Sequence, residues 1–264
     1  MSKINSFTEL SIQLATQKNY LDLLFSVYPL APDTIRTIDD KIWNGIENSY
    51  KNGDNIALFR ELLKLKLFPI KDGYVPFLRK YKEAVENNPM TVNRICGRIR
   101  ELGIDKLYEL CTTPKETNRQ MGPLFQNWVD KGTLGMKPVD LKTFLANEEN
   151  AILKGSDSEL KKFCEEYLDF KRGNDKGPDF VCRMKRRYVI GEAKFLSDEG
   201  GHQNDQFLDA MDFINTDSNW NVTKIAVLDG VLYIPSKRKM YKIITSKDMP
   251  VMSALLLRDF LYAL

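Results

Sequence analysis

The sequence predicts a mixed α/β fold, in which a mixed central sheet is flanked by helices and preceded by a largely helical region. Apolar residues recur at helical spacing through most of residues 1–150. Over residues 151–264, helical patterns alternate with short apolar runs that glycine and proline interrupt, which is typical of strands. We therefore expect two domains, 1–150 and 151–264, with the sheet in the second.

The first region is expected to be helical because three segments have apolar residues at helical spacing and a fourth segment, bounded by glycines, follows them. These segments cover residues 7–28, 55–68, 91–102 and 122–135. Pro69 should end the second of them. In the third, one apolar stripe is formed by Val92, Ile95, Ile99 and Leu102.

The second domain is expected to run α-β-β-α-β-β-β-α. Its first helix opens with Ser156 and Glu159, the pattern of a capping box. Its buried stripe should contain Leu160, Phe163, Cys164, Tyr167 and Leu168. Strands are then expected over 179–184 and 188–195, followed by a helix whose buried face carries Phe207, Ala210, Met211 and Ile214. Three further strands are expected at 223–230, 231–235 and 240–245, before a last helix at 249–264.

The composition allows a sizeable core but identifies no partner. Of the 264 residues, 43% are hydrophobic, and the net charge of +3 is too small to indicate a polyanionic partner by itself. The four cysteines have no CxxC spacing, so we expect them to be reduced and buried. The sequence has no apolar signal core and no run of ~20 apolar residues. We therefore expect a cytoplasmic protein that does not bind membranes.

The stretch Pro178–Lys194 brings chemically active residues onto a predicted hairpin. Asp179 follows a proline, and Glu192 and Lys194 end an apolar run. Because side chains alternate along a strand, Glu192 and Lys194 share a face. A turn of even length places Asp179 opposite Glu192 on that face, whereas an odd length separates the two acids. Since Lys185-Arg186 lacks glycine or asparagine, a four-residue loop is expected rather than a two-residue turn.

Two carboxylates that face each other across strands repel, so they require compensation. Lys194 can supply part of it. Mg²⁺ is a better compensator, because one or two carboxylates are its usual protein ligands. A metal in that position would activate water and stabilise charge on a phosphate, while Lys194 would orient or deprotonate the water or stabilise the developing charge. The alternative is a surface hairpin with scattered charges.

Pro178-Asp179 together with Glu192-Ala193-Lys194 resembles the PD-(D/E)xK nuclease motif. The resemblance covers about residues 155–235, and a stand-alone chain of this size with a separate helical half resembles type II restriction endonucleases most. It implies a restriction-endonuclease-like core in which Asp179 and Glu192 bind Mg²⁺ and Lys194 is the catalytic lysine. It also implies hydrolysis of double-stranded DNA to give 5′-phosphate ends, by a homodimer that cuts both strands.

The resemblance suggests two further site residues. Some members of this superfamily add a carboxylate from the preceding helix, and Glu166 fits that place better than Glu165. Some carry a glutamine on the helix after the Glu-x-Lys. Gln203 could take this part or contact DNA phosphates, although a solvated loop position is the favoured interpretation of it.

Residues that could read DNA are concentrated in and before "TTPKETNRQ", residues 112–120. Arginine suits guanine edges, and asparagine or glutamine suits adenine. The candidates are Arg94, Arg98, Lys115, Asn118, Arg119 and Gln120. The alternative is a polar loop and a solvated helix face. Region 1–150 is accordingly expected to serve DNA recognition, dimerisation or both.

Other functions are less consistent with the sequence. His202 is the only histidine, which excludes an HNH nuclease site and leaves little for a Ser-His-Asp site. No GxxxxGK[ST] phosphate loop occurs. The alternatives that stay open are a nuclease of repair, junction resolution or transposition, and a non-catalytic DNA-binding protein on a nuclease fold.

Overall fold

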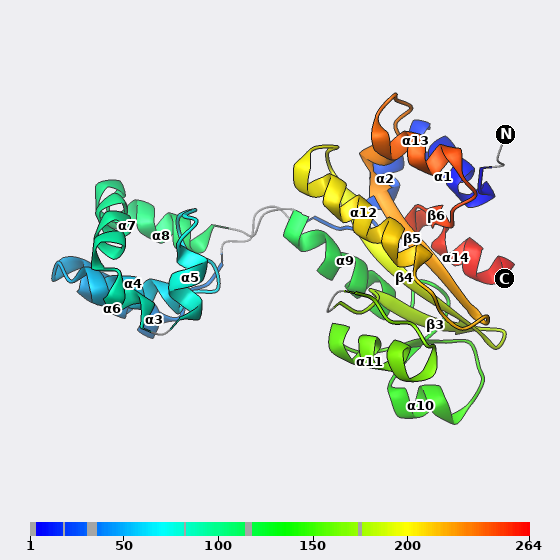
Figure 1. Ribbon diagram of the computed structural model, residues 1–264, viewed down its shortest axis with the longest axis horizontal. Coiled ribbons are helices and arrows are strands. Elements are labelled where there is room, and N and C mark those ends of the chain that lie inside the picture. Colours follow the sequence, from blue (N-terminus) through cyan, green and yellow to red (C-terminus); the bar gives the residue numbers. More distant parts are fainter. Residues whose placement is uncertain (1–3, 18, 31–35, 82, 114–117, 174–175) are drawn as a thin grey trace. The chain divides into compact units, whose positions relative to one another are not determined.

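The computed structural model describes residues 4–17, 19–30, 36–81, 83–113, 118–173 and 176–264 (Figure 1). These residues form two compact units. One comprises Met1–Leu30 and Glu116–Leu264, and the other comprises Ala31–Lys115. The units therefore divide the chain differently from the boundary expected near residue 150, because both ends of the expected helical region belong to the unit that contains the sheet.

The first unit is built on a six-stranded mixed sheet, which confirms the predicted mixed α/β class. The strands lie in chain order across the sheet. The central hairpin and its neighbour β2 are antiparallel, whereas the pairs β1–β2, β4–β5 and β5–β6 are parallel. The strands are β1 (Pro138–Val139), β2 (Ala151–Leu153), β3 (Phe180–Met184), β4 (Arg187–Leu196), β5 (Val222–Gly230) and β6 (Val251–Met252).

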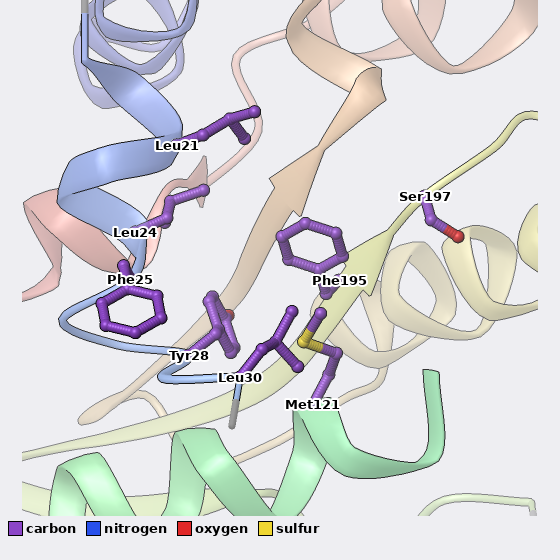
Figure 2. Close-up of a pocket in the computed structure, with 8 residues that line it drawn as sticks. All are labelled: Leu21, Leu24, Phe25, Tyr28, Leu30, Met121, Phe195 and Ser197. Carbon is purple, nitrogen blue, oxygen red and sulfur yellow. The ribbon is translucent and has the colours of Figure 1, made fainter. Parts of the chain in front are cut away.

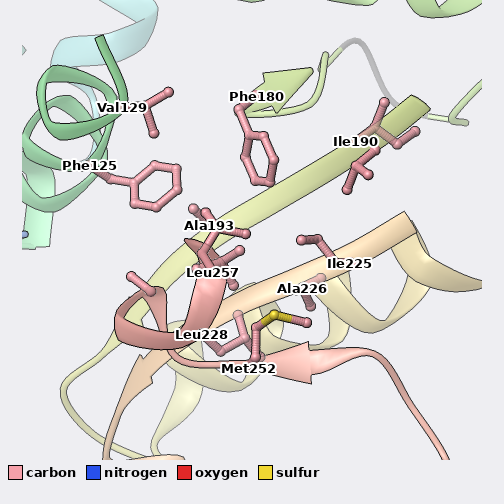
Figure 3. Packing of buried hydrophobic residues seen from close by; sticks show 14 of the residues in the cluster. Phe125, Val129, Phe180, Ile190, Ala193, Ile225, Ala226, Leu228, Met252 and Leu257 are labelled. Carbon is pink, nitrogen blue, oxygen red and sulfur yellow. The ribbon is translucent and has the colours of Figure 1, made fainter. Parts of the chain in front are cut away.

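Helices cover both faces of this sheet. On the face that carries Tyr188 and Glu192, the rings of Phe144 and Phe163 pack against Tyr188, so α10 and α11 lie there with α12. On the other face, Phe125 of α9 lies 6.1 Å from Phe180, ring centre to ring centre (Figure 3). The helices of this unit are α1 (Ser6–Thr16), α2 (Tyr20–Leu24), α9 (Asn118–Asp130), α10 (Leu141–Ala146), α11 (Asp157–Tyr167), α12 (Gly201–Asn215), α13 (Lys239–Ser246) and α14 (Ala254–Ala263).

The second unit is helical and has a core of its own. Val92, Ile95 and Ile99 of α7 are fully buried in that core, as their spacing predicts, whereas Leu102 is exposed at the end of the helix. The helix predicted over 55–68 ends at Leu63, before Pro69. The helices are α3 (Asp40–Lys51), α4 (Asn55–Leu63), α5 (Val75–Lys80), α6 (Ala84–Asn87), α7 (Pro89–Leu102) and α8 (Ile104–Thr112).

Two predicted strands near the C-terminus are wrong. Residues 231–235 begin with a single 3-10 turn at Val231–Tyr233, and residues 240–245 lie within α13. In α13, Met240 and Ile244 are the buried pair, and their spacing of four is helical. The expected last helix also begins later than predicted, because β6 precedes it and Ser253 caps α14.

The predicted capping box and the apolar faces in the first unit are confirmed. Ser156 and Glu159 form both hydrogen bonds of the box at the start of α11. Of the predicted stripe of α11, Tyr167 alone is exposed, and its ring stacks on Phe163 at the end of the helix. The apolar face of α12 is buried as predicted, and the four cysteines are free and buried.

The β3–β4 hairpin has the register that the sequence analysis required, but its turn is shorter than expected. Met184 pairs with Arg187, so Lys185 and Arg186 form a two-residue turn. Both have positive φ, 47° and 68°, as in type I′ turns. Neighbours support this conformation: Asn150 Oδ1 accepts from the Lys185 amide at 2.9 Å, and Arg186 pairs with Glu148 at 2.7 Å.

Gly191 lets the hairpin carry a large ring close to its backbone. A Cβ atom at this position would lie 2.0 Å from Phe180 Cε1. The ring of Phe180 therefore lies over the glycine and fills the space between β4 and α9, where Phe125 and Val129 also point (Figure 3). This packing fixes the strand that carries Glu192 and Lys194.

A buried aspartate attaches the N-terminal segment to the sheet. Asp229, at the end of β5, is fully buried. Its carboxylate accepts hydrogen bonds from the Tyr20 and Tyr28 hydroxyls at 3.0 Å each, from the Ser253 hydroxyl and from the Ala254 amide at 3.2 Å. Residues 20–28 thus belong to the sheet unit although they lie about two hundred residues away in sequence.

Asp229 gives a prediction about stability and pH. Burial raises the pKa of Asp229, and the four donors that lower it do not compensate fully. The native carboxyl therefore keeps its proton to a higher pH than the unfolded one. As pH rises above about 4, the unfolded state releases the proton first, so the free energy of unfolding falls until the raised pKa is passed. Asp229→Asn should lack this part of the pH dependence.

Urea unfolding at several pH values between about 4 and 8 measures this difference. The matched control is Asp259→Asn, which removes an exposed carboxylate from α14 and should follow the wild-type curve. Parallel loss of stability in wild type and Asp229→Asn would contradict the prediction.

Candidate active site

Asp179, Glu192 and Lys194 meet on one face of the β3–β4 hairpin. The Lys194 ammonium donates to Glu192 Oε1 at 2.6 Å, to the Ala193 carbonyl oxygen at 3.0 Å and to Asp179 Oδ2 at 3.3 Å. The side chains differ in exposure: 2% for Glu192, 20% for Lys194 and 35% for Asp179. The cluster therefore opens to solvent on the Asp179 side and is closed behind Glu192.

The hairpin backbone places these groups directly. The Asp179 amide donates to the Gly191 carbonyl at 2.8 Å, which continues the β3–β4 ladder by one residue and sets Asp179 opposite Glu192. Asp179 Oδ2 also accepts from the Ala193 amide at 2.6 Å. The predicted juxtaposition of the two acids is confirmed, because the turn has an even number of residues.

The charges in the cluster shift the pKa of its members. Burial raises the pKa of Glu192, and the neighbouring Asp179 carboxylate raises it further. The positive charges of Lys194 and Arg172 lower this pKa, but by less than the other two effects raise it. Burial disfavours the charged form of Lys194, but the charges of Asp179 and Glu192 outweigh it and raise the pKa of Lys194. Lys194 is therefore an ammonium that neutralises part of the repulsion between the acids.

A buried arginine that the sequence analysis did not identify lies behind Glu192. Arg172 donates to Glu192 Oε2 at 3.0 Å and to Asp209 Oδ1 at 2.7 Å, and its side chain is 2% exposed. Arg172 comes from the loop before β3, and Asp209 from α12. No local pattern distinguishes Arg172 from the other basic residues of that loop, so sequence spacing gives no signal for it.

The donor set of the cluster fits a hard cation. Within the ranges that the structure describes, no three or more His, Cys, Asp or Glu side chains gather as a metal-binding group. The Asp179–Glu192 pair nevertheless presents two carboxylate oxygens, with the Ala193 carbonyl, to a single cationic atom, Lys194 Nζ. Oxygen donors of these kinds, completed by water, are what Mg²⁺ uses.

The other acidic candidate lies away from these contacts. Glu166 is exposed on α11 and pairs with Lys162 at 3.7 Å. Its neighbour Glu165 is half-buried, pairs with Lys161 at 3.7 Å and lines a small recess with Arg172. The structure thus brings Glu165, rather than Glu166, toward the loop that carries Arg172. A metal-binding role of Glu166 stays a prediction.

Gln203 is not a solvated loop residue, contrary to the favoured interpretation. It lies in the first turn of α12 and is 7% exposed. Its Oε1 accepts from the Ser197 amide at 3.2 Å, just after β4 ends. Gln203 therefore holds the segment that follows Lys194, and a contact between Gln203 and DNA stays a prediction.

The arginines predicted to read DNA lie in the second unit. Arg94 Nη1 donates to Asp72 Oδ2 at 2.8 Å, and its guanidinium lies 5.7 Å from the Tyr74 ring centre. Arg98 is exposed on the same helix. Lys115 and the side chains of Asn118 and Arg119 lie outside the described residues, and Gln120 is half-buried in α9. Their proposed DNA contacts stay predictions.

An apolar pocket lies on the opposite face of β4 (Figure 2). Its volume is about 460 Å³. Phe195 contributes to the pocket from β4, next to Lys194 but on the other side of the strand. The ring of Tyr28 packs edge-on against that of Phe195, with 5.3 Å between the ring centres. The lining residues are Leu21, Leu24, Phe25, Tyr28, Leu30, Met121, Phe195 and Ser197. This lining offers little polar chemistry, so the acid–lysine cluster is the candidate active site.

The fold and the cluster define a mixed α/β protein with an acid pair and a lysine at the centre of its sheet. Comparison with protein families finds a match over residues 5–264 to the family described as Tsp45I type II restriction enzyme. The chain belongs to this family, and it is accordingly a DNA-binding restriction endonuclease that hydrolyses DNA. No curated protein and no solved structure matches the chain.

The helices give one further result. None of those in the described ranges combines the length and the apolar character that a membrane crossing requires.

Proposed function

We propose that this chain is a Mg²⁺-dependent type II endonuclease of the PD-(D/E)xK kind, which cuts double-stranded DNA at a specific sequence and leaves 5′-phosphate ends. The observation that carries the proposal is the convergence of Asp179, Glu192 and the Ala193 carbonyl on Lys194 Nζ. Family membership over nearly the whole chain supports site-specific cleavage over repair, junction resolution or transposition. The intact acid pair also argues against a non-catalytic DNA-binding protein.

The residues divide the chemistry between them. Asp179 and Glu192 would hold Mg²⁺, which when bound supplies water of lowered pKa and stabilises negative charge on the phosphate. Asp179, which is more exposed, lies on the side from which DNA would approach. Lys194 would orient the attacking water and stabilise the charge that develops on the phosphate oxygens. Glu192 is buried, so it closes the inner side of the site.

DNA recognition, dimerisation or both are proposed for residues 1–150. Two strands of a symmetric DNA site require two active sites, and a homodimer supplies them. The exposed Arg98 of α7, together with Arg94, Lys115, Asn118, Arg119 and Gln120, is proposed to contact phosphates and base edges.

A plasmid digest tests the proposed function. Purified protein incubated with unmodified plasmid DNA and Mg²⁺ should give discrete fragments, and sequencing of their ends should show one recurrent site with 5′-phosphates. A chelator such as EDTA should stop the reaction. Absence of cutting under these conditions, or a smear without preferred ends, would contradict a sequence-specific Mg²⁺-dependent endonuclease.

A further inference from the structure

We propose that Arg172 is a positioning residue of the active site, which holds the Glu192 carboxylate in place and is itself held by Asp209. The inference rests on the proposed function, because it assigns Arg172 to the support of the same Mg²⁺ site. Neither Arg172 nor Asp209 belongs to the acid–lysine motif. They reach it from the loop that precedes β3 and from the middle of α12.

The guanidinium of Arg172 joins two acids from different elements. Its Nη1 donates to Glu192 Oε2 at 3.0 Å, and its Nη2 donates to Asp209 Oδ1 at 2.7 Å and to the Asp209 carbonyl at 3.3 Å. The ring centre of Phe213, one turn further along α12, lies 5.2 Å from the guanidinium carbon of Arg172. Because the guanidinium is planar and its N–H groups have fixed directions, these contacts set the position of Glu192 relative to α12.

Because the Arg172–Glu192 contact is buried, it fixes the position of the Glu192 carboxylate more than it stabilises the fold. The side chains of Arg172 and Glu192 are both 2% exposed. Desolvation offsets most of the attraction within such a buried pair. The pair therefore adds little net stability, but it leaves the Glu192 carboxylate few alternative orientations.

The two cations act on different oxygens of Glu192. Lys194, which also contacts Asp179, donates to Oε1, whereas Arg172, which also contacts Asp209 of α12, donates to Oε2. Glu192 Oε1 and Asp179 Oδ2 are contacted by Lys194 and not by Arg172, so these residues would still have carboxylate oxygens with which to hold a metal ion. Arg172 does not compete for those oxygens, so it can hold Glu192 with or without a metal. Loss of a hydrogen-bond partner behind a metal ligand commonly weakens metal binding by about 10–100-fold.

Binding of Mn²⁺, measured by the electron paramagnetic resonance signal of the free ion, tests the inference in the full-length protein. Arg172→Met should weaken Mn²⁺ binding by about tenfold or more, and the Mg²⁺ concentration for half-maximal DNA cleavage should rise in parallel. Asp209→Asn keeps an oxygen acceptor but removes its charge. It should therefore weaken Mn²⁺ binding and raise the Mg²⁺ requirement of cleavage, both by less than Arg172→Met does.

Lys176→Met is the matched control. Lys176 contacts the same Asp209 at 3.4 Å, and its side chain is 62% exposed. Its removal deletes a positive charge next to Asp209 but leaves the Arg172–Glu192 contact, so Mn²⁺ affinity should change by no more than about twofold. Far-ultraviolet circular dichroism and thermal unfolding establish that each variant is folded.

The outcomes separate this inference from the proposed function. Unchanged Mn²⁺ affinity in folded Arg172→Met would overturn the positioning role. If Arg172→Met does not fold, Asp209→Asn decides in the same way, and unchanged affinity there overturns it. If Glu192→Gln binds Mn²⁺ as well as wild type does, the proposed metal site itself fails.

Discussion

Asp179→Ala and Glu192→Gln will each lower the rate of DNA cleavage by about a thousandfold or more. The two carboxylates lie opposite each other on β3–β4, and no other acid contacts Lys194 Nζ among the described residues. Each replacement therefore removes one of the two carboxylates proposed to hold Mg²⁺, and with it a negative charge. Cleavage of plasmid DNA under single-turnover conditions measures the effect.

DNA binding separates a damaged active site from a damaged protein. In Ca²⁺, both variants should bind the recognition sequence nearly as well as wild type, because phosphate and base contacts elsewhere supply most of the affinity. Glutamine is chosen at position 192 because alanine would leave buried Arg172 without its partner. Full cleavage activity in either variant would show that the acids are not the catalytic pair.

The active-site hairpin was predictable because it depends on a local rule. Side chains alternate with a period of two, so only the parity of the turn decides whether Asp179 faces Glu192. The turn length itself was not predictable. Lys185 and Arg186 adopt positive φ with the help of Asn150 and Glu148, which are far from the turn in sequence.

The errors elsewhere have a common physical origin. The apolar runs at 231–235 and 240–245 are short enough to fit either helical or strand spacing, so burial against the rest of the unit decides between them. Tertiary contacts also decide to which unit residues 1–30 belong. Their helices are amphipathic by sequence, but only the long-range bonds of Tyr20 and Tyr28 to Asp229 show that they belong to the sheet unit.

Sequence spacing could not predict the residues that support the active site. Arg172 contacts Glu192 across 20 residues and Asp209 across 37. Such contacts form only once the loop, β4 and α12 have come together. A motif search finds the groups proposed to touch metal and DNA, while the groups that hold them in place follow from tertiary structure.

Lys194→Met is expected to separate charge stabilisation from metal binding. The ammonium now lies 2.6 Å from Glu192 Oε1 and 3.3 Å from Asp179 Oδ2, and their charges raise its pKa. Methionine keeps much of the apolar stem but removes the charge. Cleavage should fall by about 100- to 10,000-fold. Mn²⁺ binding should persist, because the acids that would hold the ion are intact.

The same substitution should make the fold depend more on metal. Without Lys194, two carboxylates face each other with less compensation, and Glu192 is buried. We expect metal-free Lys194→Met to lose about 1–3 kcal/mol of unfolding free energy. Added Mg²⁺ should restore part of this loss, so it should raise Tm more in Lys194→Met than in wild type.

Lys224→Met provides the matched control, since Lys224 is half-buried on the adjacent strand β5 and donates to the Thr216 carbonyl rather than to the acid pair. It should leave both the cleavage rate and the response of Tm to Mg²⁺ close to wild type. If Lys194→Met cleaves DNA at the wild-type rate, Lys194 is not catalytic. If instead it loses Mn²⁺ binding as completely as Asp179→Ala, its main role is to organise the acids, because a cation that only stabilises charge on the phosphate is not needed to retain the metal.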